Sequence, residues 1–492
     1  MRKINFTVLF VLLAFICVIT FINSNNSFAG EKLDNEIIDK LNTLIGKNKT
    51  YETSPFTALR IQRKRGPKKC GTPIMTEIMK ALPKLSPSAR AIVDGYIFKE
   101  SPISADRSWK KGYKQVNNEF GLSNTYVSDN FVIIWGDETY SPTFGTGIPP
   151  DDDDGSGYPD FVEKLSSYFE NAWTKEIDEM GLKKPKKSSD KLIDIYIANT
   201  AGDIKPGKLT LDSSFFAYTN TYTSNNMPYI VVNNVMPTTE NDDPAGAETG
   251  SQKVTAAHEF SHAIQFAYDR NESVWWQEAS AVWMEDQVYD EVNDYIYTYM
   301  MTDTSSIDQY SPWTSVPEIH LTKVNGFHEY GTVIFAKYLS QNYTGSDMFK
   351  DVWTLCKKKS AIKAINSYLK NNGSSLKNGF IDFAVKNLDL GKNYEEGSRW
   401  QNVSKIKTIS FSAPGTIKKS IKSTSSFPHP PAYLGSNYIE IDTSVTGTLK
   451  ITFNGEKKYK GKKVKWKVKA VKQNIADNLE VSNVSLNKSN KG

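Results

Sequence analysis

The chain has 492 residues, of which 39% are hydrophobic and 23% are charged, values typical of a globular protein. Lysine and arginine number 60 against 55 aspartates and glutamates, and the net charge of +5 is too small over this length to indicate nucleic-acid binding. After the first apolar run, no stretch approaches the length needed to cross a bilayer, so we expect no transmembrane segment in the mature chain.

The N-terminus predicts an export signal. A short basic start is followed by an apolar run, a polar stretch and the small residues Ser27 and Ala29, a pattern typical of a signal peptide cleaved after Ala29. The alternative is an uncleaved anchor, because the apolar run almost reaches spanning length. We expect cleavage, and therefore a secreted protein that is extracellular or associated with the cell surface.

The remaining chain divides by pattern into three parts. Residues 30–128 are polar and helix-prone, and form either an N-terminal helical segment or a pro-segment. Residues 129–400 predict strands and helices, and residues 401–492 predict a β-rich, sandwich-like domain with a long hairpin at Asn454 and Gly455. The predicted class is α+β. In chain order, the elements expected between 129 and 300 are a strand at 131–136, a helix at 158–181, strands within 191–198, 213–220 and 228–235, and helices at about 251–268 and 275–299.

The most informative motif is "HEFSH", with His258 and His262 four residues apart and Glu259 between them. Residues four apart lie on the same helical face, so both imidazoles can reach one metal ion. This arrangement is typical of zinc hydrolases, in which zinc activates water and the glutamate takes its proton. The alternative is a helix whose histidines only cap a polar face. The apolar residues around the motif favour the metal site, since a buried histidine pair without a partner is costly.

Catalytic zinc needs a third protein ligand and one open position. No third histidine follows shortly after His262, so the search moves to the next helix, where Glu278 and Glu285 lie seven residues apart on one face. We favour Glu278, because the chain has only just turned back at the start of that helix. Glu285 and Asp286 are left as residues around the site or as solvated carboxylates.

"AAHEFSHAIQF" followed by "WWQEASAVWMED" resembles the gluzincin group of zincin metallopeptidases, and most closely a family of secreted bacterial metalloproteases. The resemblance covers about residues 130–345. It implies a mixed sheet with an edge strand, the motif helix and a helical lower subdomain, with His258, His262 and Glu278 as zinc ligands and Glu259 as general base. It also implies that the edge strand, expected at 228–235, pairs with an extended peptide. Several gluzincins have an aspartate where this chain has Val282, which leaves open the residue that orients His258.

Peptide cleavage also requires a donor to the developing oxyanion. Gluzincins often take a tyrosine or histidine from a later helix, and "GFHEYG" offers His328 and Tyr330. The alternative is that Tyr330 belongs to a core stripe at helical spacing.

The acidic stretch "DDDDGSGYPDFVE" matches the spacing of an EF-hand calcium loop, with Gly157 at the sharp turn. The alternative is a solvated acidic turn at the start of a helix. We expect calcium binding, because five closely spaced aspartates repel one another without a cation. The expected ligands are Asp152, Asp154, Ser156, Tyr158, Asp160 and Glu163.

The mature chain has two cysteines, Cys70 and Cys356. "KKCGTP" at Cys70 is similar to the cysteine-switch sequence of matrix-type pro-segments, in which a thiolate occupies the open position of zinc, and it lies near the dibasic "RKR". A disulfide to Cys356 or a buried thiol is the interpretation that we favour. Nine lysines between Lys457 and Lys472 predict a solvated strand face, with contact to anionic wall polymers as the alternative.

These patterns together predict a secreted, monomeric, zinc-dependent endopeptidase that acts on protein or peptide substrates and also binds calcium. The rival hypothesis is a non-catalytic, calcium-stabilised surface or adhesion protein on a zincin scaffold. The complete set of zinc ligands and the general base favour the enzyme.

Overall fold

The computed structural model confirms the α+β class. The predicted signal peptide lies outside the described residues. Among the described residues, none of the helices combines the length and the apolar character needed to span a membrane. The structure describes residues 30–47, 70–101, 120–141, 145–186, 192–200, 206–301, 312–411, 431–443, 450, 452–455, 457–459, 461–473, 479–483 and 485.

The chain forms two compact units. The first contains residues up to Gln277 together with Ala281–Thr298, and the second contains Glu278–Ser280 and the chain from Tyr299 onward. The first unit is built from a helix at residues 30–45, α3 (Thr72–Ala81), η1 (Leu82–Lys84), α4 (Pro87–Asp94), β1 (Leu122–Val127), β2 (Phe131–Gly136), α5 (Asp160–Trp173), η2 (Thr174–Glu179), β3 (Ile193–Ala198), β4 (Ala217–Thr221), β5 (Pro228–Asn233), α6 (Ala247–Asp269) and most of α7 (Val274–Val288).

The five strands form one mixed sheet in the order β1-β2-β3-β5-β4. Strands β2, β3 and β5 are parallel, and β1 and β4 pair antiparallel at the two edges. The expectation that residues 228–235 form the edge strand is therefore wrong, because β5 lies between β3 and β4. A strand that pairs on both sides and is buried throughout reads as a continuous apolar run, which is how "PYIVVN" reads. The edge strand next to the motif helix is β4.

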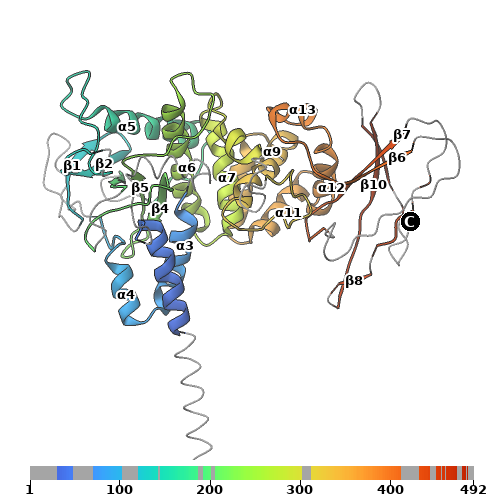
Figure 1. Cartoon of the computed structure of the whole chain (residues 1–492), viewed down its shortest axis with the longest axis horizontal. Helices are drawn as coiled ribbons and strands as arrows, with labels where there is room; N and C mark the ends of the chain where they lie inside the picture. The colour runs from blue at the N-terminus through green and yellow to red at the C-terminus, as the bar shows by residue number, and fades with distance from the viewer. Residues whose placement is uncertain are drawn as a thin grey trace, which may run out of the picture. The chain divides into compact units, whose positions relative to one another are not determined.

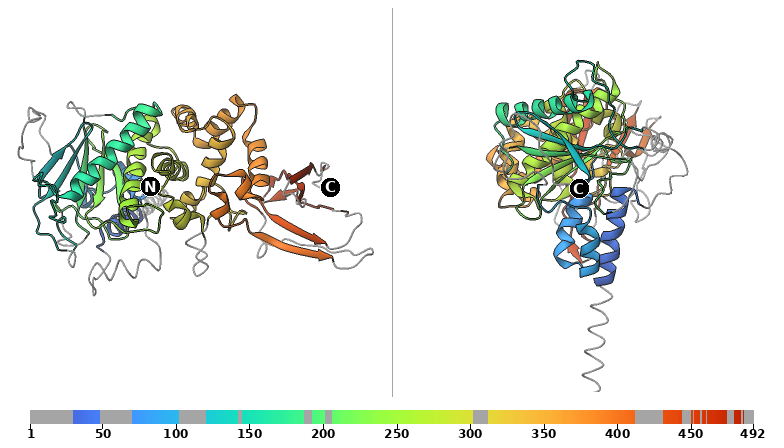
Figure 2. Two further views of the ribbon diagram at one scale, coloured as in Figure 1. Left: turned by 90° about the horizontal axis from the view of Figure 1, so that it is seen from above. Right: turned by 90° about the vertical axis from the view of Figure 1, so that its left-hand side faces the viewer.

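Alternation along the strands divides the sheet into two apolar faces. One face packs against α5 and α6, where Phe131 of β2 meets Phe169 and Trp173 of α5 and Phe260 of α6. The other face packs against the N-terminal helices. Figures 1 and 2 show α5 and the pair α3 and α4 on opposite sides of the strands. The apolar residues shared with the N-terminal helices include Ile37, Leu41, Leu44, Met75, Ile78, Val132, Ile134, Tyr196, Tyr218, Tyr229 and Val231.

The second unit is mainly helical and ends in short strands. Its described tail contains three separate two-stranded sheets, and the packing of these into a sandwich stays a prediction. A short hairpin forms between β8 and β9, and Gly461, with a φ of +76°, lies in its turn. This hairpin lies inside the stretch that was expected to link two longer strands through a turn at Asn454 and Gly455. The elements are η3 (Ile296–Met300), which begins in the first unit, α8 (His328–Gly331), α9 (Val333–Asn342), α10 (Asp347–Cys356), α11 (Ala361–Asn371), α12 (Leu376–Lys386), α13 (Leu390–Asn393), η4 (Gly397–Arg399), β6 (Lys405–Phe411), β7 (Tyr438–Thr443), β8 (Lys458–Tyr459), β9 (Lys462–Lys463), β10 (Lys469–Gln473) and β11 (Leu479–Asn483).

Replacing Phe169 by alanine tests the packing of α5 on the sheet. The side chain is fully buried against Phe131, so we expect Phe169→Ala to lower the free energy of unfolding by about 3–5 kcal/mol through lost burial and the cavity left behind. Ser167→Ala, at an exposed position of the same helix, is the control and should change it little. Urea denaturation followed by circular dichroism measures both, and equal midpoints for the two variants would contradict this packing.

Candidate metal centre

Two histidines project from one face of the motif helix. Helix α6 is buried from Gly250 to Gln265 apart from Lys253, so its middle turns lie in the protein interior and not on a solvated face. His258 and His262 are four residues apart, and their Nε2 atoms lie 3.0 Å from each other. The interpretation that the histidines cap a polar surface is therefore wrong.

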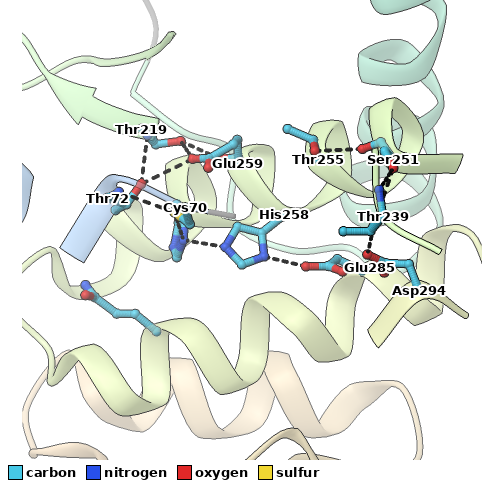
Figure 3. Close-up of polar contacts among 12 residues, drawn as sticks. Cys70, Thr72, Thr219, Thr239, Ser251, Thr255, His258, Glu259, Glu285 and Asp294 are labelled. Carbon is cyan, nitrogen blue, oxygen red and sulfur yellow. Dashed lines mark hydrogen bonds and ion pairs between the residues drawn. The ribbon is translucent and has the colours of Figure 1, made fainter. Parts of the chain in front are cut away.

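The other ring nitrogen of each histidine has a hydrogen-bond acceptor. His258 Nδ1 lies 2.6 Å from Glu285 Oε1 on α7, as Figure 3 shows, and His262 Nδ1 lies 2.8 Å from Gln265 Oε1. The amide of Gln265 is itself oriented, because its Nε2 donates to the carbonyl of Gln277 at 3.0 Å. Nδ1 therefore donates the hydrogen bond in both rings, and the neutral form of each ring presents a lone pair at Nε2.

Two nitrogen lone pairs at this separation repel each other unless a positive charge lies between them. In a buried setting that repulsion is poorly screened, so the arrangement favours a bound cation. A hydrogen bond from Nδ1 to a carboxylate or a carbonyl oxygen is the usual way in which proteins orient histidine ligands of a metal.

The structure adds two further donors to the histidine pair. Cys70 and Glu278 join His258 and His262 in a buried group whose ligand atoms all lie within 4.8 Å of one another. Cys70 Sγ is 3.4 Å from His262 Nε2. Tetrahedral zinc with ordinary bond lengths separates nitrogen and sulfur ligand atoms by about 3.3–3.6 Å. The four side chains therefore offer donor types that could hold a metal ion.

The sequence left Glu278 and Glu285 as alternatives, and the structure separates their positions. Glu278 lies in the group of four, and Glu285 lies on the outer side of His258, at Nδ1. Glu285 is only 1% exposed, so it is not a solvated carboxylate. It occupies the orienting position that Val282 cannot fill.

Glu259 lies next to this group and is held by two threonines. Its Oε2 accepts hydrogen bonds from Thr219 Oγ1 at 2.6 Å and from Thr72 Oγ1 at 3.2 Å. Thr72 Oγ1 also accepts the backbone N–H of Thr219 at 2.8 Å, which fixes the orientation of its hydroxyl (Figure 3). Sequence reasoning missed both threonines, because they come from segments distant in the chain and carry no motif.

A second buried carboxyl lies near His258. Glu176 on η2 is fully buried, and neither of its oxygens has a hydrogen-bond partner among the described residues. Burial raises the pKa of Glu176 well above its ordinary value, with a smaller opposing effect from His258.

Cys70 and Cys356 are both buried thiols, so the second of the two favoured interpretations holds and the disulfide is not formed. Cys70 lies instead beside the histidines, in the position that the cysteine-switch alternative requires. The dibasic sequence near it lies outside the described residues. The signal that identifies Cys70 is weak in the sequence, because nearly 190 residues separate it from His258.

His328 and Tyr330 lie on α8, and both are buried. Tyr330 stacks on Tyr299 with ring centroids 5.0 Å apart, as the core alternative expects. Among the described residues, the metal-binding group does not include His328. The role of either residue as oxyanion donor stays a prediction.

The acidic loop before α5 is exposed and internally hydrogen-bonded. Asp152 accepts the N–H groups of Ser156 and Gly157, Asp154 accepts that of Ser156, and Asp160 accepts that of Asp153. Gly157 has a φ of +87°, which the sharp turn requires. Calcium binding by this loop stays a prediction.

Residues 99–474 match the model of a family described as "Family of unknown function (DUF6055)". No curated protein matches the chain. The matched range contains His258, His262, Glu278 and Glu259 and begins after Cys70 and Thr72.

Replacing Glu285 tests its position behind His258. We expect Glu285→Ala to weaken zinc binding by about 10- to 100-fold, because His258 loses the acceptor that orients its ring. Glu285→Gln keeps an acceptor and should lose less. Competition titration with a chromophoric chelator measures the affinity, and Glu291→Gln, at an exposed carboxylate after α7, is the control. Equal affinities of Glu285→Ala and the wild type would contradict this role.

Proposed function

The chain belongs to the DUF6055 family, and we propose that it is a secreted zinc-dependent endopeptidase of the gluzincin type. One observation carries the proposal. The buried group of His258, His262 and Glu278 lies beside Glu259, and both histidine Nε2 atoms present lone pairs. Three such ligands with an adjacent glutamate are the arrangement that metal-assisted peptide hydrolysis requires.

The proposed reaction divides its tasks among these side chains. His258, His262 and Glu278 would hold zinc, which would supply a Lewis acid for the scissile carbonyl and for water. The Glu259 carboxylate accepts the proton of the attacking water and returns it to the leaving amine. Thr219 holds Glu259 in place, and Glu285 and Gln265 keep the histidine rings in the binding tautomer. Tyr330 and His328 are the proposed donors to the oxyanion.

The substrate in this proposal is an extended peptide that pairs with β4. Strand β4 is an edge strand, and it runs next to the helix that carries Glu259. Its residue Thr219 contacts the general base directly. A peptide added at this edge gains main-chain hydrogen bonds that do not depend on its side chains, so binding tolerates many sequences.

Export follows from the signal sequence, and the substrates are accordingly extracellular proteins or peptides. The chain acts as a monomer. The lysines between 457 and 472 provide a basic surface for contact with anionic cell-wall polymers.

Replacing Glu259 tests the reaction. Because catalytic zinc needs an open position, the test uses Cys70→Ala, which leaves three donors. We expect zinc-loaded Cys70→Ala to hydrolyse casein, and Cys70→Ala/Glu259→Gln to lose about a hundredfold or more in kcat, since the general base is gone.

Zinc content, measured by mass spectrometry of the eluted metal, should be equal in the two proteins. The control is Glu291→Gln in the Cys70→Ala background, which should keep full turnover. The contradicting result is one equivalent of bound zinc and no turnover in either Cys70→Ala or the double variant. That result would overturn the peptidase and favour the non-catalytic surface or adhesion protein.

The acidic loop is the proposed calcium site, with Asp152, Asp154, Ser156, Asp160 and Glu163 as side-chain ligands and Tyr158 as a carbonyl ligand. We expect millimolar calcium to add about 2 kcal/mol of stability, because an extracellular site of moderate affinity binds only the folded chain. Calorimetry with and without chelator measures this as a shift in Tm. The shift should vanish in Asp152→Asn/Asp154→Asn and persist in Asp129→Asn, and an unmoved Tm in the wild type would remove the calcium site.

A further inference from the structure

One short segment of the N-terminal region contacts both the metal-binding group and the general base of the proposed active site. Cys70 Sγ lies 3.4 Å from His262 Nε2, and Thr72 Oγ1 lies 3.2 Å from Glu259 Oε2. Cys70 therefore reaches the metal-binding group, and Thr72 reaches the general base two residues later. Figure 3 shows both side chains on the same side of the site.

We propose that Cys70 is the fourth zinc ligand and that residues 70–72 hold the peptidase in a latent state. This rests on the function proposed above. A zinc site with three protein ligands keeps a position open for water and substrate, and a fourth protein ligand closes it. The thiolate of Cys70 fills that position, and the Thr72 hydroxyl donates to one oxygen of the carboxylate that must accept the proton.

The backbone around Cys70 places a hydrogen-bond donor against its sulfur. The sulfur accepts the backbone N–H of Thr72 at 3.3 Å, and it lies just before the N-terminus of α3, where the helix dipole stabilises negative charge. Binding to zinc releases the thiol proton to solvent. Release of the sulfur leaves a thiolate that takes up a proton, and water enters the vacated position, so no oxidant or reductant is needed.

The same residues also occupy the edge on which a substrate would pair. Cys70 forms an isolated parallel bridge with Ala217 of β4, and the N–H of Gly71 donates to the Ala217 carbonyl at 2.8 Å. A Cβ at Gly71 would lie 2.7 Å from Leu44 Cδ1 and 3.1 Å from Tyr218 Cβ, so a residue with a side chain does not fit here without a shift. The segment thus excludes substrate from β4 as well as water from the metal.

Activation requires residues 70–72 to move away from the site, while the rest of the N-terminal region stays in place. The helix at 30–45 and α3 and α4 cover the second apolar face of the sheet, including Tyr196, Tyr229 and Val231. Removing them would expose this face to water at a cost of many kcal/mol. Cys70–Thr72, in contrast, contacts β4 through the Gly71 N–H and the Thr72 hydroxyl, and contacts the site through the side chains of Cys70 and Thr72.

Alkylation of the two cysteines tests the ligand assignment without any activity measurement. Iodoacetamide is added to the full-length protein after export, with one equivalent of zinc or after chelation, and each site is followed by mass spectrometry. We expect zinc to slow the alkylation of Cys70 by about tenfold or more, because the thiolate is then a ligand. Cys356, which is also buried, is the internal control, and zinc should not change its rate. Equal rates at Cys70 with and without bound zinc would overturn the proposal.

Turnover of casein then tests latency. Wild-type protein should be about tenfold or more less active than Cys70→Ala at equal zinc content, because only the open fraction is competent. Thr72→Val keeps the shape of the side chain and should leave the zinc protection of Cys70 intact. If the wild type is as active as Cys70→Ala and this activity depends on Glu259, latency is overturned and the proposed peptidase function is retained. If zinc protects Cys70 from alkylation but no variant is active, the latent enzyme is overturned. The four residues then form a closed structural zinc site.

Discussion

The site depends on the placement of two imidazole lone pairs 3.0 Å apart in the protein interior. This placement is unfavourable without a cation, and the chain maintains it through the partners of the outer nitrogens. Glu285 reaches His258 from α7, and Gln265 reaches His262 from within α6. The second bond depends on the Gln277 carbonyl at the start of α7, so the pairing of α6 with α7 determines the chemistry of the histidines.

The sequence predicted the parts of the fold that are governed by local periodicity. The strands β2, β3, β4 and β5 and the helices α5, α6 and the start of α7 follow from apolar spacing, which the neighbouring residues determine. Strand β1 was missed, since "LSNTYV" is half exposed and has no continuous apolar run. The assignment of the sheet edge was wrong, because strand order depends on contacts between distant segments, and β5 and β4 are both buried throughout.

In the candidate site, too, the sequence predicted what depends on local spacing and missed what depends on contacts between distant segments. The spacing of His258 and His262, with Glu278 and Glu285 one helix later, is readable because helical geometry relates residues that are close in sequence. The contacts of Cys70, Thr72 and Thr219 depend on how the N-terminal segment crosses β4, and a single sequence carries no signal for that crossing. The similarity of "KKCGTP" to a switch sequence gave the one hint, and a disulfide with Cys356 or a buried thiol was the favoured interpretation.

The segment at residues 70–72 also covers the edge of the sheet at β4. An open edge strand offers unpaired N–H and C=O groups to any extended chain, and proteins normally cover such an edge to avoid aggregation. All five residues of β4 are buried, which an edge strand achieves only when something lies along its outer side. A peptidase that binds substrates by strand addition needs the same edge to open. The residues that cover β4 also approach the metal-binding group. In the proposed latent peptidase, one movement of residues 70–72 would therefore open both the strand edge and the metal site.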